Sequence, residues 1–226
     1  CVRNDDDVKN LINGDDGIIN YLKPGTILID HTTTSAELPI ELNKSLHLKK
    51  VSFLDAPVSG GQAGAESGIL SVMVGGNKES YEDVKEIIGT YSKFIKYMGE
   101  SGSGQLTKMV NQICIAGLIQ ALAEGINFSD EVGLNTKDVI EVISKGAAQS
   151  WQMENRWKTM INDEYDHGFA VDLMRKDLDI VLKKAEKNNI PIDITRVVND
   201  YYKDIQKAGG GRLDTSSLLK RIKDLI

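Results

Sequence analysis

Cysteine and histidine are both scarce in this sequence, and their scarcity argues against two classes of protein. The two cysteines, Cys1 and Cys114, show no paired spacing that would suggest a disulfide scaffold. The three histidines, His31, His47 and His167, are scattered without the spacing of a structural zinc site. We therefore expect no metal site, and a reducing, cytoplasmic location.

A basic stripe and a membrane-spanning run are also missing. The formal net charge is -6, and acidic and basic residues are interleaved, which argues against nucleic acid or an anionic membrane as the main partner. The longest apolar run, residues 113–123, has roughly half the length that a bilayer-spanning helix needs. We therefore expect small molecules, or further copies of the chain, as partners.

The first half of the chain alternates between strand and helix signals. Compact apolar runs predict strands over residues 26–30, 51–55, 69–76 and 94–98. Helical spacing predicts a short helix after residue 4 and helices over residues 36–46 and 78–88. This alternation is typical of an α/β fold with a mostly parallel sheet.

After residue 104 the strand signals vanish, and every remaining segment is predicted to be helical. The first of these helices, from Gln105 to about Val132, is apolar nearly all round and should be a long, buried central helix. Further helices are predicted over residues 137–144, 151–161, 171–188, 192–208 and 218–226. The sequence thus predicts an α/β domain over residues 1–104 and an all-α domain over residues 105–226.

The glycines of the stretch 99–112 lead directly into this central helix. Lys108 and Asn111 are three residues apart, so an ammonium and a carboxamide point the same way from its opening turns. Burial and the positive end of the helix dipole would disfavour a charged Lys108, which suits a lysine that gives and takes back a proton. The alternative is an ordinary surface lysine, but the run that follows is too apolar to leave much of the helix in water.

Two other segments carry candidate site residues. Ser59, Gly60 and Gly61 follow a strand, at the place where open sheets bind ligands, and their hydroxyl and amides would suit an anion. An ordinary turn explains this segment equally well. Lys176 and Asp177 fall on the polar face of a helix, where spacing alone favours two solvated charges. The dinucleotide fingerprint G-x-G-x-x-G does not occur in the chain.

Together, four motifs resemble those of the β-hydroxyacid dehydrogenase family, most closely its bacterial-type 3-hydroxyisobutyrate dehydrogenase branch. They are the segments 30–33, 53–68, 99–111 and 176–178, and they occur in the family's order along the whole chain. The family's 6-phosphogluconate relatives usually carry a histidine where this chain has Val110, so they match less well.

The resemblance implies a Rossmann-type domain joined by a long helix to an all-helical domain. It implies oxidation of a short 3-hydroxy acid to its semialdehyde with NAD or NADP, as in valine catabolism. Lys108 would be the general acid and base, and Asn111 would orient the lysine and the substrate hydroxyl. The resemblance assigns two further sets of residues: Ser59, Gly60 and Gly61 to the substrate carboxylate, and Thr33, Lys176 and Asp177 to the cofactor.

The beginning of the chain departs from the family pattern. Family members begin with a strand, a glycine-rich turn and a helix that hold the cofactor pyrophosphate, and this sequence starts after them. We therefore expect part of the Rossmann domain to be absent here, with weak or no NAD or NADP binding by this chain alone. One alternative function is a non-catalytic fragment or oligomerisation module. Within the enzyme class, a tartronate, glyoxylate or succinate semialdehyde reductase is an alternative, and the apolar helices suggest a homo-oligomer, a dimer or tetramer.

Overall fold

The computed structural model describes residues 1–224, which divide into two compact units. The first unit is Cys1–Val110, and the second begins at Asn111 and contains the rest of the described residues. This division lies six residues beyond the boundary expected at residue 104, because the long helix α5 (Ser103–Glu131) begins in the first unit and continues in the second. Each unit is described separately.

The first unit contains a five-stranded mixed sheet. β1 (Ile27–Asp30) pairs parallel with β2 (Ser52–Asp55), and β4 (Leu70–Gly76) pairs parallel with β5 (Ser92–Gly99). β4 also runs antiparallel to both β2 and the short β3 (Val58–Ser59). The alternation of strands and helices predicted a mostly parallel sheet, but β3 pairs back against β4 and the chain reverses between β2 and β4.

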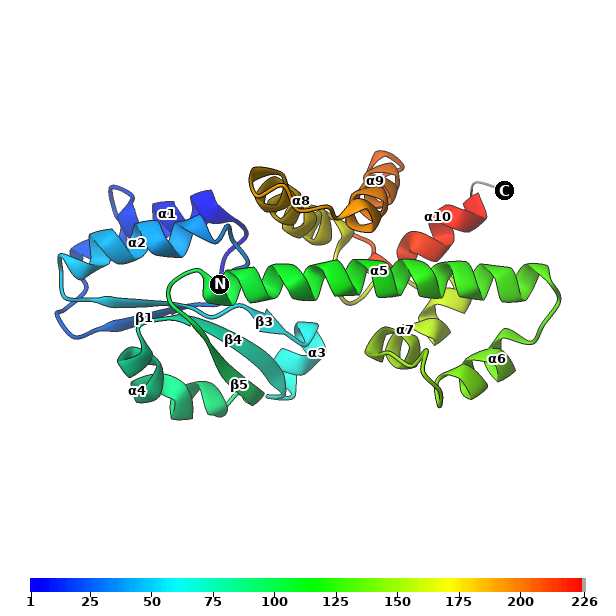
Figure 1. Cartoon of the computed structure of the whole chain (residues 1–226), viewed down its shortest axis with the longest axis horizontal. Helices are drawn as coiled ribbons and strands as arrows, with labels where there is room; N and C mark the ends of the chain where they lie inside the picture. Colours follow the sequence, from blue (N-terminus) through cyan, green and yellow to red (C-terminus); the bar gives the residue numbers. More distant parts are fainter. Residues whose placement is uncertain (225–226) are drawn as a thin grey trace. The chain divides into compact units, whose positions relative to one another are not determined.

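Helices cover both faces of this sheet (Figure 1). α1 (Asp5–Asn13) and α2 (Glu37–His47) lie on one face, and α4 (Lys78–Gly89) lies on the other. Two shorter elements, η1 (Ile18–Asn20) and α3 (Gly61–Glu66), complete the unit. No helix is predicted from the sequence over the residues of α3, because this stretch is rich in glycine.

The cores on the two faces follow from the alternation of side chains along β2. Phe53 packs with the buried residues of α1 and α2, whereas the next residue, Leu54, packs with Val84 and Ile88 of α4. Successive side chains of a strand point to opposite faces, so one short strand contributes to both cores. Phe53 and Leu54 are fully buried, with at most 1% of their surface exposed.

The second unit is all-helical, as expected. Its remaining elements are α6 (Thr136–Ile143), α7 (Trp151–Ile161), α8 (Val171–Lys187), α9 (Asp193–Lys207), η2 (Thr215–Ser217) and α10 (Leu218–Asp224). In Figure 1, α6 and α7 lie on one side of α5, and α8, α9 and α10 lie on the other. The last two positions of the helix expected over residues 218–226 lie outside the described residues.

Helix α5 is less completely buried than its composition predicted. Ala116, Ile119 and Ile126 are fully buried in the core of the second unit, but Leu118 is 43% exposed and Phe128 is 66% exposed. Among residues 1–224, α5 is also the one helix that is long and apolar enough to cross a membrane. A core helix of a soluble protein meets the same criteria, so this finding is weak evidence for a membrane span.

Candidate functional site

The first turn of α5 is fixed by the carboxylate of Asp55, at the end of β2. One oxygen of Asp55 accepts a hydrogen bond from the amide of Gly102 at 2.8 Å, and the other accepts from the amide of Gln105 at 3.0 Å. These donors belong to the start of a helix, where amides have no intrahelical partner. Burial raises the pKa of Asp55 to about 6, although these amides act to lower it.

The glycines of this stretch permit the close approach of α5 to the sheet. Gly102 has a φ of +91°, a conformation that favours glycine. At Gly104 an added Cβ would lie 2.5 Å from the carbonyl oxygens of both Asp55 and Met73. Gly102 and Gly104, which precede Lys108 in the sequence, therefore allow the start of α5 to pack closely against the sheet.

Lys108 is buried, with 7% of its surface exposed. Its Nζ donates a hydrogen bond to the backbone carbonyl of Val58 at 2.8 Å. Val58 directly precedes Ser59, so within the first unit the structure brings Lys108 to the start of the segment proposed to bind the substrate carboxylate. The alternative of an ordinary surface lysine does not fit this burial.

The segment after Ser59 has the backbone conformation of a glycine turn. Ser59 is partly buried in β3, and Gly60 and Gly61 have φ values of +139° and +62°. An added Cβ at Gly61 would meet no atom within 4 Å, so backbone conformation rather than crowding calls for glycine there. Both glycines are exposed, and a ligand could therefore approach this turn.

The loop after β1 carries Thr33 and is held by buried polar groups. A carboxylate oxygen of Asp30 accepts hydrogen bonds from the backbone amide and the hydroxyl of Thr32, at 3.0 and 2.6 Å. The side chain of Gln105 accepts from the amide of Thr34 at 3.0 Å and donates to the carbonyl of Thr32 at 2.7 Å. Thr33 lies between these anchored residues and is partly buried.

This loop fits a nicotinamide cofactor on two grounds. It follows the carboxyl end of a strand in a parallel pair, which is where open α/β sheets bind such ligands. The backbone groups on both sides of Thr33 already have protein partners, so the loop is ordered before a ligand arrives. Thr33 lies at the centre of this anchored loop and is the residue that the resemblance assigns to the cofactor.

In the second unit, hydrogen bonds connect Asn111 to Asp177. The Asn111 carboxamide donates to the Gln112 side chain at 2.7 Å, and Gln112 donates to an oxygen of Asp177, also at 2.7 Å. The other Asp177 oxygen lies 2.9 Å from the Lys176 ammonium. Asp177 is 2% exposed, so the expectation from spacing of two solvated charges is wrong for this residue.

Sequence reasoning missed two glutamines of this arrangement, Gln105 and Gln112. Both are 1% exposed, and their side chains bridge segments that are distant in sequence. A signal was present, because both lie within one turn of Lys108 on an otherwise apolar helix. Among residues 1–224, no group of three or more potential metal ligands comes together.

Family models match nearly all of the chain. Residues 1–99 match the NAD binding domain of 6-phosphogluconate dehydrogenase. Residues 102–222 match a model described as NAD-binding of NADP-dependent 3-hydroxyisobutyrate dehydrogenase. The chain belongs to the β-hydroxyacid dehydrogenase family. It is therefore an oxidoreductase of the 3-hydroxyisobutyrate dehydrogenase-like group. The two family models confirm the expected cofactor as NAD or NADP.

Individual relatives agree with this assignment to the β-hydroxyacid dehydrogenases. An uncharacterized oxidoreductase of Shewanella frigidimarina is 52% identical over 99% of this chain and 77% of its own length. The 2-(hydroxymethyl)glutarate dehydrogenase of Eubacterium barkeri is 30% identical, over 94% of this chain and 71% of its own length. The crystal structure of a 3-hydroxyisobutyrate dehydrogenase from Salmonella typhimurium has a TM-score of 0.86 at 27% identity, and the match covers 97% of this chain and 76% of that one.

Proposed function

We propose that this protein uses NAD or NADP to interconvert a short 3-hydroxy acid and its semialdehyde, with 3-hydroxyisobutyrate as the first substrate to test. The observation that carries the proposal is the buried Lys108, whose Nζ lies 2.8 Å from the carbonyl oxygen of Val58. A buried lysine needs a reason to be there, because burial disfavours its charge. Proton transfer at the substrate hydroxyl is such a reason.

In the oxidation, Lys108 in its neutral form takes the hydroxyl proton as the C–H bond at the same carbon breaks. In the reduction it returns that proton to the carbonyl oxygen. When bound, the nicotinamide supplies the acceptor or donor of the hydride. Asn111, three residues further along the same helix, is proposed to hydrogen-bond the reacting oxygen and hold it beside the lysine.

Ser59, Gly60 and Gly61 are proposed to bind the substrate carboxylate. The Ser59 hydroxyl and the amides of the glycine turn are donors, and donors to a carboxylate make strong, charge-assisted hydrogen bonds. The hydrogen bond from Lys108 to the Val58 carbonyl supports this placement. Ser59 follows Val58 directly in the chain, so the proposed carboxylate site begins next to the residue that Lys108 contacts.

The proposed cofactor contacts are Thr33 in the first unit and Lys176 with Asp177 in the second. Thr33 lies in the loop that the Gln105 side chain anchors. Lys176 is held by the buried carboxylate of Asp177, so its ammonium has a fixed position near the start of α8. A lysine in a fixed position can act as a point charge toward a phosphate or carboxamide of the cofactor.

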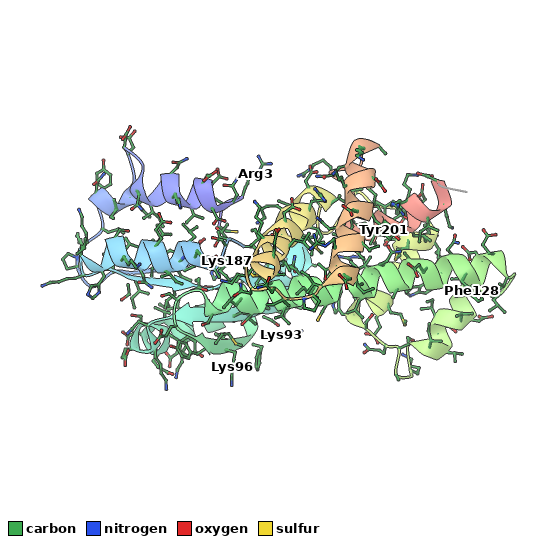
Figure 2. The ribbon with its side chains drawn as sticks, turned by 45° about the horizontal axis from the view of Figure 1, so that its top comes forward. Arg3, Lys93, Lys96, Phe128, Lys187 and Tyr201 are labelled. Carbon is green, nitrogen blue, oxygen red and sulfur yellow. The ribbon has the colours of Figure 1, made fainter. Side chains whose placement is uncertain are left out.

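The experiment that tests this function measures cofactor-dependent turnover by the full-length protein. The panel contains the oxidation of 3-hydroxyisobutyrate and of 2-(hydroxymethyl)glutarate, and the reduction of glyoxylate, tartronate semialdehyde and succinate semialdehyde, each with NAD(H) and NADP(H). Lys108→Ala is expected to lower kcat about 10²- to 10⁴-fold, the usual contribution of a general acid or base. Lys96→Ala is the matched control, because Lys96 is an exposed lysine of β5 (Figure 2).

The same panel distinguishes the remaining alternatives. If glyoxylate or one of the two semialdehydes is reduced far faster than 3-hydroxyisobutyrate is oxidised, the enzyme is one of the reductases of this class. Titration of the chain with NAD and NADP tests the non-catalytic module, because micromolar binding would argue strongly against it. If neither turnover nor binding is found, the proposed function is wrong.

We also propose that the protein is a homo-oligomer, a dimer or tetramer located in the cytoplasm. The support is two large apolar side chains exposed on α5, Leu118 and Phe128, of which Phe128 is labelled in Figure 2. Large apolar side chains left exposed on a helix are available for contact with a second copy of the chain. Light scattering during size-exclusion chromatography gives the mass directly, and a monomer at micromolar concentration would contradict the proposal.

A further inference from the structure

The side chain of Gln105 uses both ends of its carboxamide on the loop after β1. Its oxygen accepts from the amide of Thr34 at 3.0 Å, and its nitrogen donates to the carbonyl of Thr32 at 2.7 Å. The two partners flank Thr33. The backbone on either side of Thr33 is therefore fixed by one side chain from a segment about 70 residues later in the sequence.

Gln105 is itself held in place. It is 1% exposed, and its own amide donates to the buried carboxylate of Asp55 at 3.0 Å. A buried carboxamide with both ends paired has little freedom to rotate, since breaking either hydrogen bond would leave a buried polar group unpaired. Through Gln105, the position of the loop is therefore fixed relative to the first turn of α5 and to the end of β2.

Two further contacts hold the ends of this loop. The ring of His31 lies 2.6 Å from the carbonyl oxygen of Ala56 and 3.0 Å from the hydroxyl of Tyr91. Ser35 binds the carboxylate of Asp5 through both its amide and its hydroxyl. These contacts fix the entry and exit of the loop. The Asp30 carboxylate also binds the amide and hydroxyl of Thr32, whereas Gln105 bonds to the backbone of both residues adjacent to Thr33.

We propose that Gln105 is a positioning residue that sets the backbone of Thr33 for the nicotinamide cofactor. The inference rests on the proposed function, because it takes Thr33 as a cofactor contact. Gln105 also precedes Lys108 by three residues on the same helix. The residue that orders the cofactor loop is therefore anchored in the same helical turn as the proposed proton relay.

The test compares Gln105→Leu and Gln105→Glu with the parent in the full-length enzyme. Leucine removes both hydrogen bonds, whereas glutamate keeps an acceptor for Thr34 and loses the donor to Thr32. Gln120→Leu is the matched control, because Gln120 is also a buried glutamine of α5 and is 7% exposed, but it bonds only locally, to Glu124. For each variant, the KM of the cofactor, the KM of the hydroxy acid, kcat and the unfolding midpoint are measured.

Loss of two buried hydrogen bonds is expected to raise the cofactor KM about tenfold or more in Gln105→Leu. The KM of the hydroxy acid should change much less. Gln105→Glu should also raise the cofactor KM, because a second oxygen would face the carbonyl of Thr32. Hydrogen exchange at the Thr34 amide should accelerate in Gln105→Leu and not in Gln120→Leu, a readout that needs no cofactor.

An unchanged cofactor KM in Gln105→Leu, with a loss of stability equal to that of Gln120→Leu, would overturn the inference and leave Gln105 a purely structural residue. An unchanged rate of exchange at Thr34 would also overturn it. If Gln105→Leu does not fold, the cofactor KM of Gln105→Glu decides in the same way. Failure of the proposed function would be distinguishable from failure of this inference, because in the first case the parent enzyme itself would show no cofactor-dependent turnover.

Discussion

The side-chain amide of Gln112 donates a hydrogen bond to the buried carboxylate of Asp177, at 2.7 Å. These two residues are 65 positions apart, and their contact joins α5 to α8 within the second unit. The same carboxylate holds Lys176 at 2.9 Å, and Gln112 is also bound by Asn111. A proposed catalytic residue and a proposed cofactor residue therefore depend on one buried acid.

Asp177→Asn should destabilise the second unit. The substitution keeps the shape of the side chain but removes the charge that compensates Lys176 and weakens the bond from Gln112. Because Lys176 is one-quarter exposed, we expect a loss of about 2 kcal/mol in the free energy of unfolding rather than the larger cost of a fully buried pair. Urea denaturation measures it.

The control for this prediction is Glu186→Gln on the same helix. Glu186 is exposed, so its neutralisation should change stability by less than about 0.5 kcal/mol. Equal effects of the two substitutions would show that the buried network contributes nothing specific.

Asp55 should give the protein a distinctive dependence of stability on pH. Its pKa is raised to about 6 from 3.8, so between these values the folded state binds more protons at this site than the unfolded state does. The stabilising contribution of the site is complete below about pH 4 and is lost as the pH rises through about 6. The full difference is about 3 kcal/mol.

Other carboxylates also titrate in this range, so the measurement is a difference between two proteins. Unfolding free energies of the parent and Asp55→Asn are compared at pH 4, 5, 6 and 7. We expect the stability of the parent relative to the variant to increase as the pH falls. A difference that stays constant across this range would contradict the raised pKa.

Two glycines of α5 should respond in opposite directions to alanine. Gly104→Ala places a Cβ 2.5 Å from two carbonyl oxygens, so the helix must move away from the sheet, at a cost of about 2 kcal/mol or more. Gly117→Ala meets no atom within 4 Å and should gain about 0.5 to 1 kcal/mol from helix propensity. Thermal unfolding of both variants checks the pair, and a stable Gly104→Ala protein would show that the close approach is not required.

Much of the secondary structure could be predicted from the sequence because its signals are local. The helix at Trp151–Ile161 has the bounds predicted from the sequence, and the structure adds its cap, the Ser150 hydroxyl, which accepts from the Met153 amide. The antiparallel direction of β4 could not be predicted, since an apolar run reads the same in either direction. β3 has only two residues, too few for a periodic pattern.

Some residues of the candidate site could be predicted from the sequence, and others could not. The four motifs that contain the proposed site residues are short contiguous segments, so they can be recognised in the sequence, and the resemblance to the family is confirmed. The roles of Gln105 and Gln112 depend on contacts between residues more than 60 positions apart. The burial of Asp177 likewise follows from tertiary packing, which spacing along one helix does not contain.

Chemical rescue of Lys108→Ala is the sharpest test of Lys108 as the proton relay. In the full-length enzyme, turnover of the best hydroxy acid is measured with increasing methylamine, and Lys96→Ala is treated in parallel. If Lys108 is the proton relay, its loss should lower kcat by about 10²- to 10⁴-fold, and methylamine should restore part of the rate in this variant alone. Turnover by Lys108→Ala at the rate of its parent would show that Lys108 is not the proton relay.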